Sequence, residues 1–186
     1  DYNSFKIMGY KSISNPLLID LKNKIVPIIG INECGKTTIL KAIFSFDHFN
    51  DKLLNGEHLQ DITNLYNPYD KQPAIIEADI ALNQIKFKEI ITTLQKEAKD
   101  KTTTGLSAKT YSEICKNIPS SIKIQRVLNG TRQYKIIDNI LANEDKIIIN
   151  NIIEEVIQGL PHIIYFDSFD DLLLKTTSLL KTYPEV

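Results

Sequence analysis

Two alternating stretches near the start of the chain are separated by turn-forming residues. Phe5 to Gly9 reads FKIMG and Leu17 to Leu21 reads LLIDL, with Ser, Asn and Pro between them. Alternation of apolar and polar side chains is typical of a strand with one buried face, and those intervening residues favour a turn. The pattern therefore predicts an N-terminal β-hairpin.

A nearly continuous apolar run, KIVPII at residues 24–29, precedes a glycine-containing loop and a helical pattern. Such a run predicts a strand buried on both faces. Pro27 has no N–H to donate to a neighbouring strand, so we expect one unpaired position there. After Thr37, apolar residues return at helical spacing and predict an amphipathic helix that ends in DHFNDK; they are Ile39, Leu40, Ile43 and Phe44.

The middle of the chain alternates between long polar connections and clear periodic patterns. Residues 49–73 show little periodicity and predict a long irregular connection. Ala74 to Leu82 predicts a strand, and from Asn83 an amphipathic helix follows, its apolar face formed by Phe87, Ile90, Ile91, Leu94 and Ala98. A weaker helix is expected at 107–118.

The last third of the chain carries a hairpin signal and one more helix and strand. Asn129 and Gly130 lie between two alternating runs, and both tolerate the positive φ of a type I′ turn. Residues 143–158 predict a helix with Gly159 as its C-cap. HIIYFD, at 162–167, predicts a short buried strand.

Composition adds a cellular context and a charge asymmetry. The 186 residues include 22 basic and 23 acidic side chains, but residues 84–135 carry 11 basic and 4 acidic ones, whereas 136–186 carry 3 and 9. Two cysteines, Cys34 and Cys115, give no disulfide framework and favour a reducing, cytoplasmic environment. No apolar run approaches the roughly 20 residues of a membrane-spanning helix, so we expect no membrane association.

Residues 30–38, GINECGKTT, fit the GxxxxGK[ST] phosphate-binding pattern. Gly30 lets the chain turn sharply, Gly35 allows close approach, and successive backbone N–H groups of Asn32, Glu33 and Cys34 can point at an anion. The following helix N-terminus adds partial positive charge. In this chemistry Lys36 bridges the β- and γ-phosphates of ATP, Thr37 ligates Mg²⁺, and Thr38 contacts the α-phosphate. The alternative is a glycine-rich turn with a solvated lysine.

With these motifs, residues 5–43 resemble the N-terminal lobe of ABC/SMC-like ATPases, and most closely the OLD (overcoming lysogenization defect) type of ATP-dependent endonuclease. In that group an aromatic-basic-Ser element ends the first strand and an Asn lies in the phosphate loop. Tyr10, Lys11, Ser12 and Asn32 occupy those places. The resemblance implies that Lys11 and Ser12 contact nucleotide; otherwise they form an exposed turn.

The resemblance implies an α/β P-loop NTPase lobe with a mixed sheet, an N-terminal β-hairpin and inserted helices. The expected organisation is a P-loop lobe at 1–82, a helical and hairpin insert at 83–142, and a returning helix and strand at 143–186. It also implies ATP hydrolysis with Mg²⁺, dimerisation of two ATPase heads, and a DNA nuclease module, often in defence against phage.

Several partners that this family places around the phosphate loop are missing from the sequence. We find no LSxGxQ signature and no switch histidine. Asp167, after an apolar run, has the form of a Walker B metal ligand, but Ser168 stands where a catalytic Glu belongs; the competing interpretation is a core strand ending in a solvated loop. We therefore expect part of a longer protein, which binds ATP weakly by itself and hydrolyses it slowly or not at all.

Other residues admit two interpretations. Cys34 occupies a loop position that requires a small side chain, and this is its expected role. The alternative is a redox-sensitive thiol beside Lys36. The three histidines, His48, His58 and His162, lack metal-ligand spacing. Basic residues of 84–135 either contact DNA or form solvated faces; they are Lys86, Lys88, Lys96, Lys99, Lys101, Arg126, Arg132 and Lys135. The alternatives for the whole chain are a stand-alone P-loop kinase or GTPase, although NKxD is absent, and a DNA- or partner-binding switch module.

Overall fold

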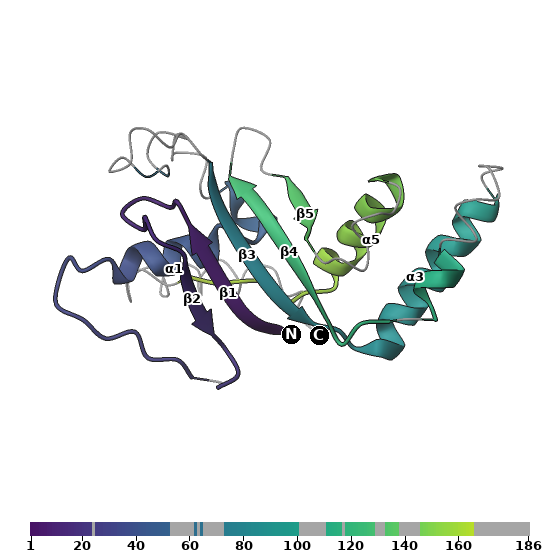
Figure 1. The fold of residues 1–186 in the computed structure, drawn as a ribbon, viewed down its shortest axis with the longest axis horizontal. Coiled ribbons are helices and arrows are strands. Elements are labelled where there is room, and N and C mark those ends of the chain that lie inside the picture. The colour runs from purple at the N-terminus through teal and green to yellow at the C-terminus, as the bar shows by residue number, and fades with distance from the viewer. Residues whose placement is uncertain are drawn as a thin grey trace, which may run out of the picture.

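The computed structural model describes residues 1–23, 25–52, 62, 64, 73–100, 111–116, 118–128, 133–137 and 146–165. Five strands form one sheet in the order β2-β1-β3-β4-β5, and every pairing is antiparallel (Figure 1). The strands are β1 (Tyr2–Met8), β2 (Leu17–Asp20), β3 (Ala74–Ala81), β4 (Ser121–Leu128) and β5 (Tyr134–Ile136). The expectation of a mixed sheet is therefore wrong for the described strands.

Strand alternation places one face of the sheet in the core. In β3 every second residue is buried, from Ala74 to Ile80. Ile76 lies opposite Ile7 of β1 on one side and Arg126 of β4 on the other. Because facing residues of paired strands lie on the same side of a sheet, Arg126 is on the core face, where its side chain is 1% exposed.

Helices described at full length beside the sheet are α1 (Lys36–Phe44), α3 (Gln84–Asp100) and α5 (Lys146–Gln158). Helix α1 packs near β1, and α5 packs near both α3 and β5 (Figure 1). Their apolar faces join the buried face of the sheet in one cluster that includes Ala42, Phe87 and Ile152. Asn83 begins α3 by accepting hydrogen bonds from the N–H groups of Ile85 and Lys86, as an N-cap residue does.

The structure confirms the elements whose signals were local. The first hairpin forms, β3 and α3 follow the predicted ranges, and β4 pairs with β5, with the predicted Asn129-Gly130 turn outside the described residues. The weaker helix is observed as a helical turn at 111–114. Most of the connection at 49–73 lies outside the described residues, apart from a 3₁₀ turn at His48–Lys52. The division into three parts stays a prediction.

Two predicted buried strands, at 24–29 and 162–167, are not observed in the parts of them that the structure describes. Residues 25–30 form no strand, and Ile25 and Ile29 are 85% and 90% exposed. Residues 161–165 are extended without strand pairing, and Ile164 is 70% exposed. An apolar run becomes a buried strand only where it pairs with a neighbouring strand, and neither segment joins the described sheet.

One smaller expectation changes. Leu40, predicted on the buried face of α1, is 41% exposed, and the side chains that α1 buries are Ala42 and Phe44. Gly159 directly follows the last residue of α5, as predicted for its C-cap, and its N–H bonds to the Glu155 carbonyl without a positive φ. Among the described helices, none combines the length and apolar character needed to cross a membrane.

Candidate nucleotide-binding loop and its supporting hub

The N-terminus of α1 has free capacity to bind an anion. Its N-cap residue is Gly35, in the left-handed conformation with φ of 93°, and no side chain caps the helix. No acidic residue lies in the first turn. The first N–H groups of a helix have no intrahelical acceptor and carry partial positive charge. This end of α1 therefore presents donors that suit a phosphate.

Lys36, the first residue of α1, folds back across the loop. Its Nζ donates hydrogen bonds to the carbonyls of Gly30 and Ile31, at 2.7 and 2.6 Å, and lies 3.7 Å from the Cys34 sulfur. The ammonium group thus lies within the loop that the sequence pattern assigns to phosphate, held by neutral acceptors. A phosphate oxygen is a stronger, charged acceptor for the same group, so this arrangement fits nucleotide binding.

Gly30 and Cys34 face each other across the base of the loop. A Cβ added at Gly30 would lie 2.4 Å from the Cys34 sulfur, well inside van der Waals contact. Cys34 itself is exposed and free. A side chain at position 30 would therefore need the Cys34 side chain to move aside.

Ser12 comes close to the loop from a distant part of the sequence. A Cβ added at Gly35 would lie 3.8 Å from the Ser12 hydroxyl oxygen. Ser12 belongs to the turn after β1, where Lys11 has a positive φ of 49° and bonds through its N–H to the Ile62 carbonyl. The structure therefore brings Ser12 to the phosphate loop, whereas the Lys11 ammonium lies 5.7 Å from the centre of the Tyr10 ring.

The remaining predicted ligands lie along the same loop and helix. Asn32 and Glu33 are exposed, Glu33 with a positive φ of 63°, and Thr37 and Thr38 are in the first turn of α1. Asp167, the proposed metal-side carboxylate, lies outside the described residues. Within the described residues, no group of three or more His, Cys, Asp or Glu side chains could hold a metal ion.

The opposite end of α1 rests on a buried polar hub, which we define as residues 45–51. Arg126 of β4 donates from Nη1 to the Ser45 carbonyl, at 2.7 Å, and pairs through Nη2 with Asp51. Its guanidinium also lies 4.9 Å from the centre of the Tyr134 ring. A cation at a helix C-terminus meets the negative end of the helix dipole. Arg126 thus ties α1 to β4, and the expectation that it contacts DNA is wrong because it is buried.

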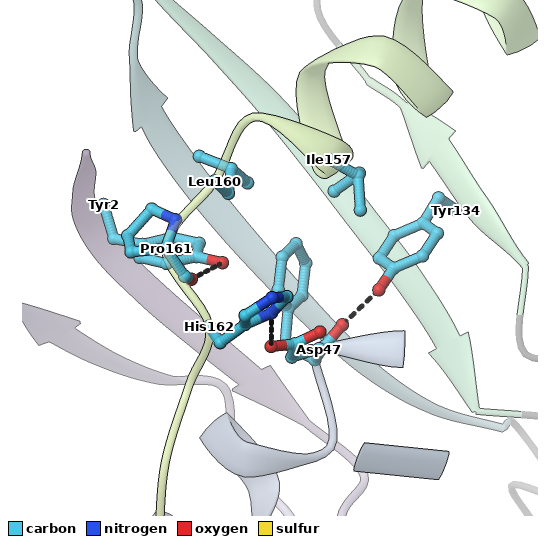
Figure 2. Close-up of a pocket in the computed structure, with 8 residues that line it drawn as sticks. Tyr2, Asp47, Tyr134, Ile157, Leu160, Pro161 and His162 are labelled. Atoms are coloured by element: carbon cyan, nitrogen blue, oxygen red, sulfur yellow. Dashed lines mark hydrogen bonds and ion pairs between the residues drawn. The ribbon is translucent and has the colours of Figure 1, made fainter. Parts of the chain in front are cut away.

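Asp47 and His162 lie in the pocket of Figure 2, which separates the hub from the C-terminal end of α5. The pocket is also lined by Tyr2, Tyr134 and Pro161, and its volume of about 10 Å³ is that of roughly one water molecule. The Asp47 side chain is 6% exposed, and its Oδ2 is 3.2 Å from Nδ1 of His162. This pocket is a packed junction, too small for a substrate.

Burial changes the acidity of two tyrosines beside this junction. Desolvation raises the pKa of Tyr134 to about 12, with the neighbouring Arg126 acting in the opposite direction. The Tyr134 hydroxyl donates to the Phe46 carbonyl and accepts from the His48 N–H. Desolvation, followed by the charge of Asp47, also raises the pKa of Tyr2. Both phenols are therefore neutral donors at physiological pH.

The hub was missed by the sequence interpretation, although one signal pointed to it. In β4, residues 122, 124 and 128 are buried and apolar, and Arg126 shares their face. A charged residue in register with a buried face requires partners within the core. The other basic side chains of the 84–135 segment that the structure describes are exposed; they are Lys86, Lys88, Lys96, Lys116, Lys123 and Lys135. His48 and His162 serve as packing residues against Phe49.

Similarity to known proteins is strongest in the fold. The chain is similar to a solved structure from work on the ATP-driven dimerization and DNA-stimulated activation of SMC ATPases, with a TM-score of 0.53, 14% identity, and coverage of 98% of this chain and 92% of that one. At this identity the likeness establishes only that the two chains share a fold. No protein-family model matches the chain.

A curated relative is similar over a shorter stretch. The chromosome partition protein Smc of Delftia acidovorans (strain DSM 14801 / SPH-1) is 34% identical over 61 residues, which are 32% of this chain. Those residues are 5% of the relative, so the chain matches about a twentieth of that protein's length. Neither similarity bears specifically on an OLD-type nuclease.

Proposed function

We propose that this chain is an ATP-binding lobe of an SMC-like ATPase, in which residues 30–38 hold the nucleotide's phosphates. The observation that carries the proposal is the free N-terminus of α1 with Lys36 folded into the loop. Backbone N–H groups and Lys36 bind the phosphates, Thr37 holds Mg²⁺, and Ser12 approaches from the first hairpin. Magnesium-bound ATP would supply the free energy that couples binding to conformational change.

Exposure of residues 25–31 suggests that the lobe is half of a complete site. Ile25, Ile29 and Ile31 are each more than 80% exposed immediately before the loop. In Figure 1 the chain between β2 and α1 swings out from the sheet. We propose that a further segment of a longer polypeptide covers this run and brings the missing catalytic carboxylates. The isolated chain would then bind ATP but hydrolyse it slowly.

Substituting Lys36 tests nucleotide binding directly. Lys36→Ala should weaken binding of ATP with Mg²⁺ by about 10- to 100-fold, because a hydrogen bond to a charged group contributes roughly 1.5–3 kcal/mol. Titration calorimetry of the full chain measures the affinity. The matched control is Lys41→Ala, which removes the same side chain from the last turn of the same helix. Equal affinities for the two variants would contradict the proposal.

Two finer properties of the whole protein, nuclease activity and DNA contact, are also proposed, each from a smaller set of residues. An OLD-type nuclease activity is supported by Tyr10, Lys11, Ser12 and Asn32 alone, and cleavage of plasmid DNA by the longer protein would test it. Contact with DNA is supported by the exposed lysines Lys86, Lys88 and Lys96 of α3. Neutralising all three lysines should reduce the salt-dependent shift of DNA mobility that the protein causes in a gel. An unchanged shift would show that this face of α3 does not contact DNA.

A further inference from the structure

The extended segment that follows α5, residues 161–165, is here called the strap. It lies across the hub, with Pro161, His162 and Ile164 exposed. Because it pairs with no strand among the described residues, its backbone needs other hydrogen-bond partners. Those partners are side chains of the hub.

Two buried side chains hold Ile163 from both sides of its backbone. The Ile163 N–H donates to Asp47 Oδ2 at 3.0 Å, and its carbonyl accepts from Asn50 Nδ2 at 2.9 Å. Asp47 and Asn50 are 6% and 8% exposed. A buried carboxylate or amide loses free energy when its hydrogen bonds are lost. The two side chains therefore form a clamp on one residue of the strap.

The same clamp is continuous with α1. Asn50 Nδ2 also donates to the Phe44 carbonyl, at the last residue of α1, and Asp47 Oδ1 accepts from the Phe49 N–H. Further along the strap, the Tyr165 ring lies 6.0 Å from the Phe44 ring. Helix α1 is only nine residues long, or about 13 Å. Its first residue, Lys36, belongs to the phosphate loop, so one short helix joins the loop to the strap.

We propose that α1, the hub and the strap open as one cooperative unit, with Asp47 and Asn50 as the positioning residues that join the strap to it. If residues 30–38 bind nucleotide as proposed above, nucleotide bound there also stabilises the strap. A ligand that binds only the closed unit lowers the population of the open unit by a factor of up to 1 + [L]/Kd, about 100-fold when ligand is at 100 times its Kd.

The clamp is tested without nucleotide by amide hydrogen exchange of the full chain. Asp47→Asn keeps the size of the side chain but leaves one acceptor oxygen for the two N–H groups of Phe49 and Ile163, which each have their own oxygen in Asp47. Exchange at Ile163 should become at least about tenfold faster. The control is Asp20→Asn, which alters an exposed carboxylate whose hydrogen bond, to the Lys22 N–H, is local. Unchanged protection of Ile163 in Asp47→Asn would overturn the clamp.

Coupling is tested by adding ADP with Mg²⁺. In the unsubstituted chain, protection should rise at α1 and at Ile163 together; in Asp47→Asn it should rise at α1 alone. A rise at α1 without one at Ile163 in the unsubstituted chain overturns the coupling and leaves the proposed function standing. No change in protection at α1 or at Ile163 overturns both the coupling and the proposed function. The experiment without nucleotide decides separately whether the clamp exists.

A second variant guards against misfolding of Asp47→Asn. His162→Gln changes a side chain that is 56% exposed and lies on the strap itself. It removes the ring that meets Asp47 Oδ2 and Phe49, without altering the hub. Amide exchange at Ile163 should become faster, while the protection of α3 stays unchanged. If Ile163 is equally protected in His162→Gln, in Asp47→Asn and in the unsubstituted chain, the clamp is overturned.

Discussion

Gly30 and Cys34 show how tightly the phosphate loop is packed. Gly30→Ala should lower ATP affinity by about tenfold, because the added Cβ would overlap the Cys34 sulfur and overpacking costs roughly 1–3 kcal/mol. Cys34→Ala removes that sulfur and should bind ATP normally. The double variant should recover most of the lost affinity, since the two substitutions share one space. Calorimetric titration of all four chains measures this; a double variant as weak as Gly30→Ala would contradict the packing argument.

Tyr134 should make the stability of the chain sensitive to high pH. Burial raises its pKa to about 12, against about 10 in an unfolded chain. The stabilisation is complete below pH 10 and is lost as pH rises from 10 through 12, because only the unfolded state ionises readily there. The free energy of unfolding should fall by at most about 1.4 kcal/mol per pH unit from this residue.

Tyr134→Phe is the comparison that isolates this effect. Its stability should be lower at pH 7 by about 1–3 kcal/mol, since the Phe46 carbonyl and the His48 N–H lose a partner. Above pH 10 its stability should fall less steeply than that of the unsubstituted chain, because the Tyr134 phenol no longer titrates and no longer raises the pKa of Tyr2. Urea unfolding from pH 7 to 11.5 measures the two slopes; parallel curves would contradict the assignment.

At the scale of elements, Arg126 is the link between β4 and α1. Arg126→Met should destabilise the chain by about 3 kcal/mol, the lower end for a broken buried ion pair, because Asp51 is 33% exposed and water can reach it. The buried Ser45 carbonyl would also lose its donor. Thermal unfolding measures the loss. Lys123→Met, exposed on the opposite face of the same strand, should change stability little; an equal loss in both variants would contradict the link.

Elements whose patterns are local were predictable, and elements whose burial depends on distant partners were not. The hairpin of β1 and β2, the pairing of β4 with β5, and α3 follow from alternation, turn residues and a capping Asn83. Residues 25–30 and 161–165 have equally apolar runs, but they form no strand and most of their side chains are exposed. An apolar run indicates that burial is favourable, and it does not specify which strand provides it.

The candidate site was predictable in part for the same reason. Gly30, Gly35 and Lys36 could be assigned because a phosphate loop is encoded in consecutive residues, and their roles as ligands stay predictions. Asp47 and Arg126 could not be assigned from the sequence, because their partners Ile163 and Asp51 are 116 and 75 residues away. Only the tertiary fold brings such pairs together, and a single sequence carries no signal of which distant residues meet.

For the whole molecule, the exposed run before the phosphate loop should govern association. Ile25 and Ile29 are almost fully exposed, and burying an isoleucine side chain contributes roughly 1.5–3 kcal/mol. In the absence of the segment that we propose to cover them, copies of the chain should associate through this run. Ile25→Lys combined with Ile29→Lys should shift the chain towards monomer, because two charged side chains resist burial.

Sedimentation velocity over a range of protein concentrations measures that shift. A matched control is Ile147→Lys combined with Ile164→Lys, which changes two isoleucines that are 69% and 70% exposed but lie away from the loop. The control should associate like the unsubstituted chain, and the Ile25 and Ile29 variant should keep its affinity for ATP, since neither side chain belongs to the loop. Equal association of both variants would show that exposed apolar surface in general, rather than the run before the phosphate loop, drives the contact.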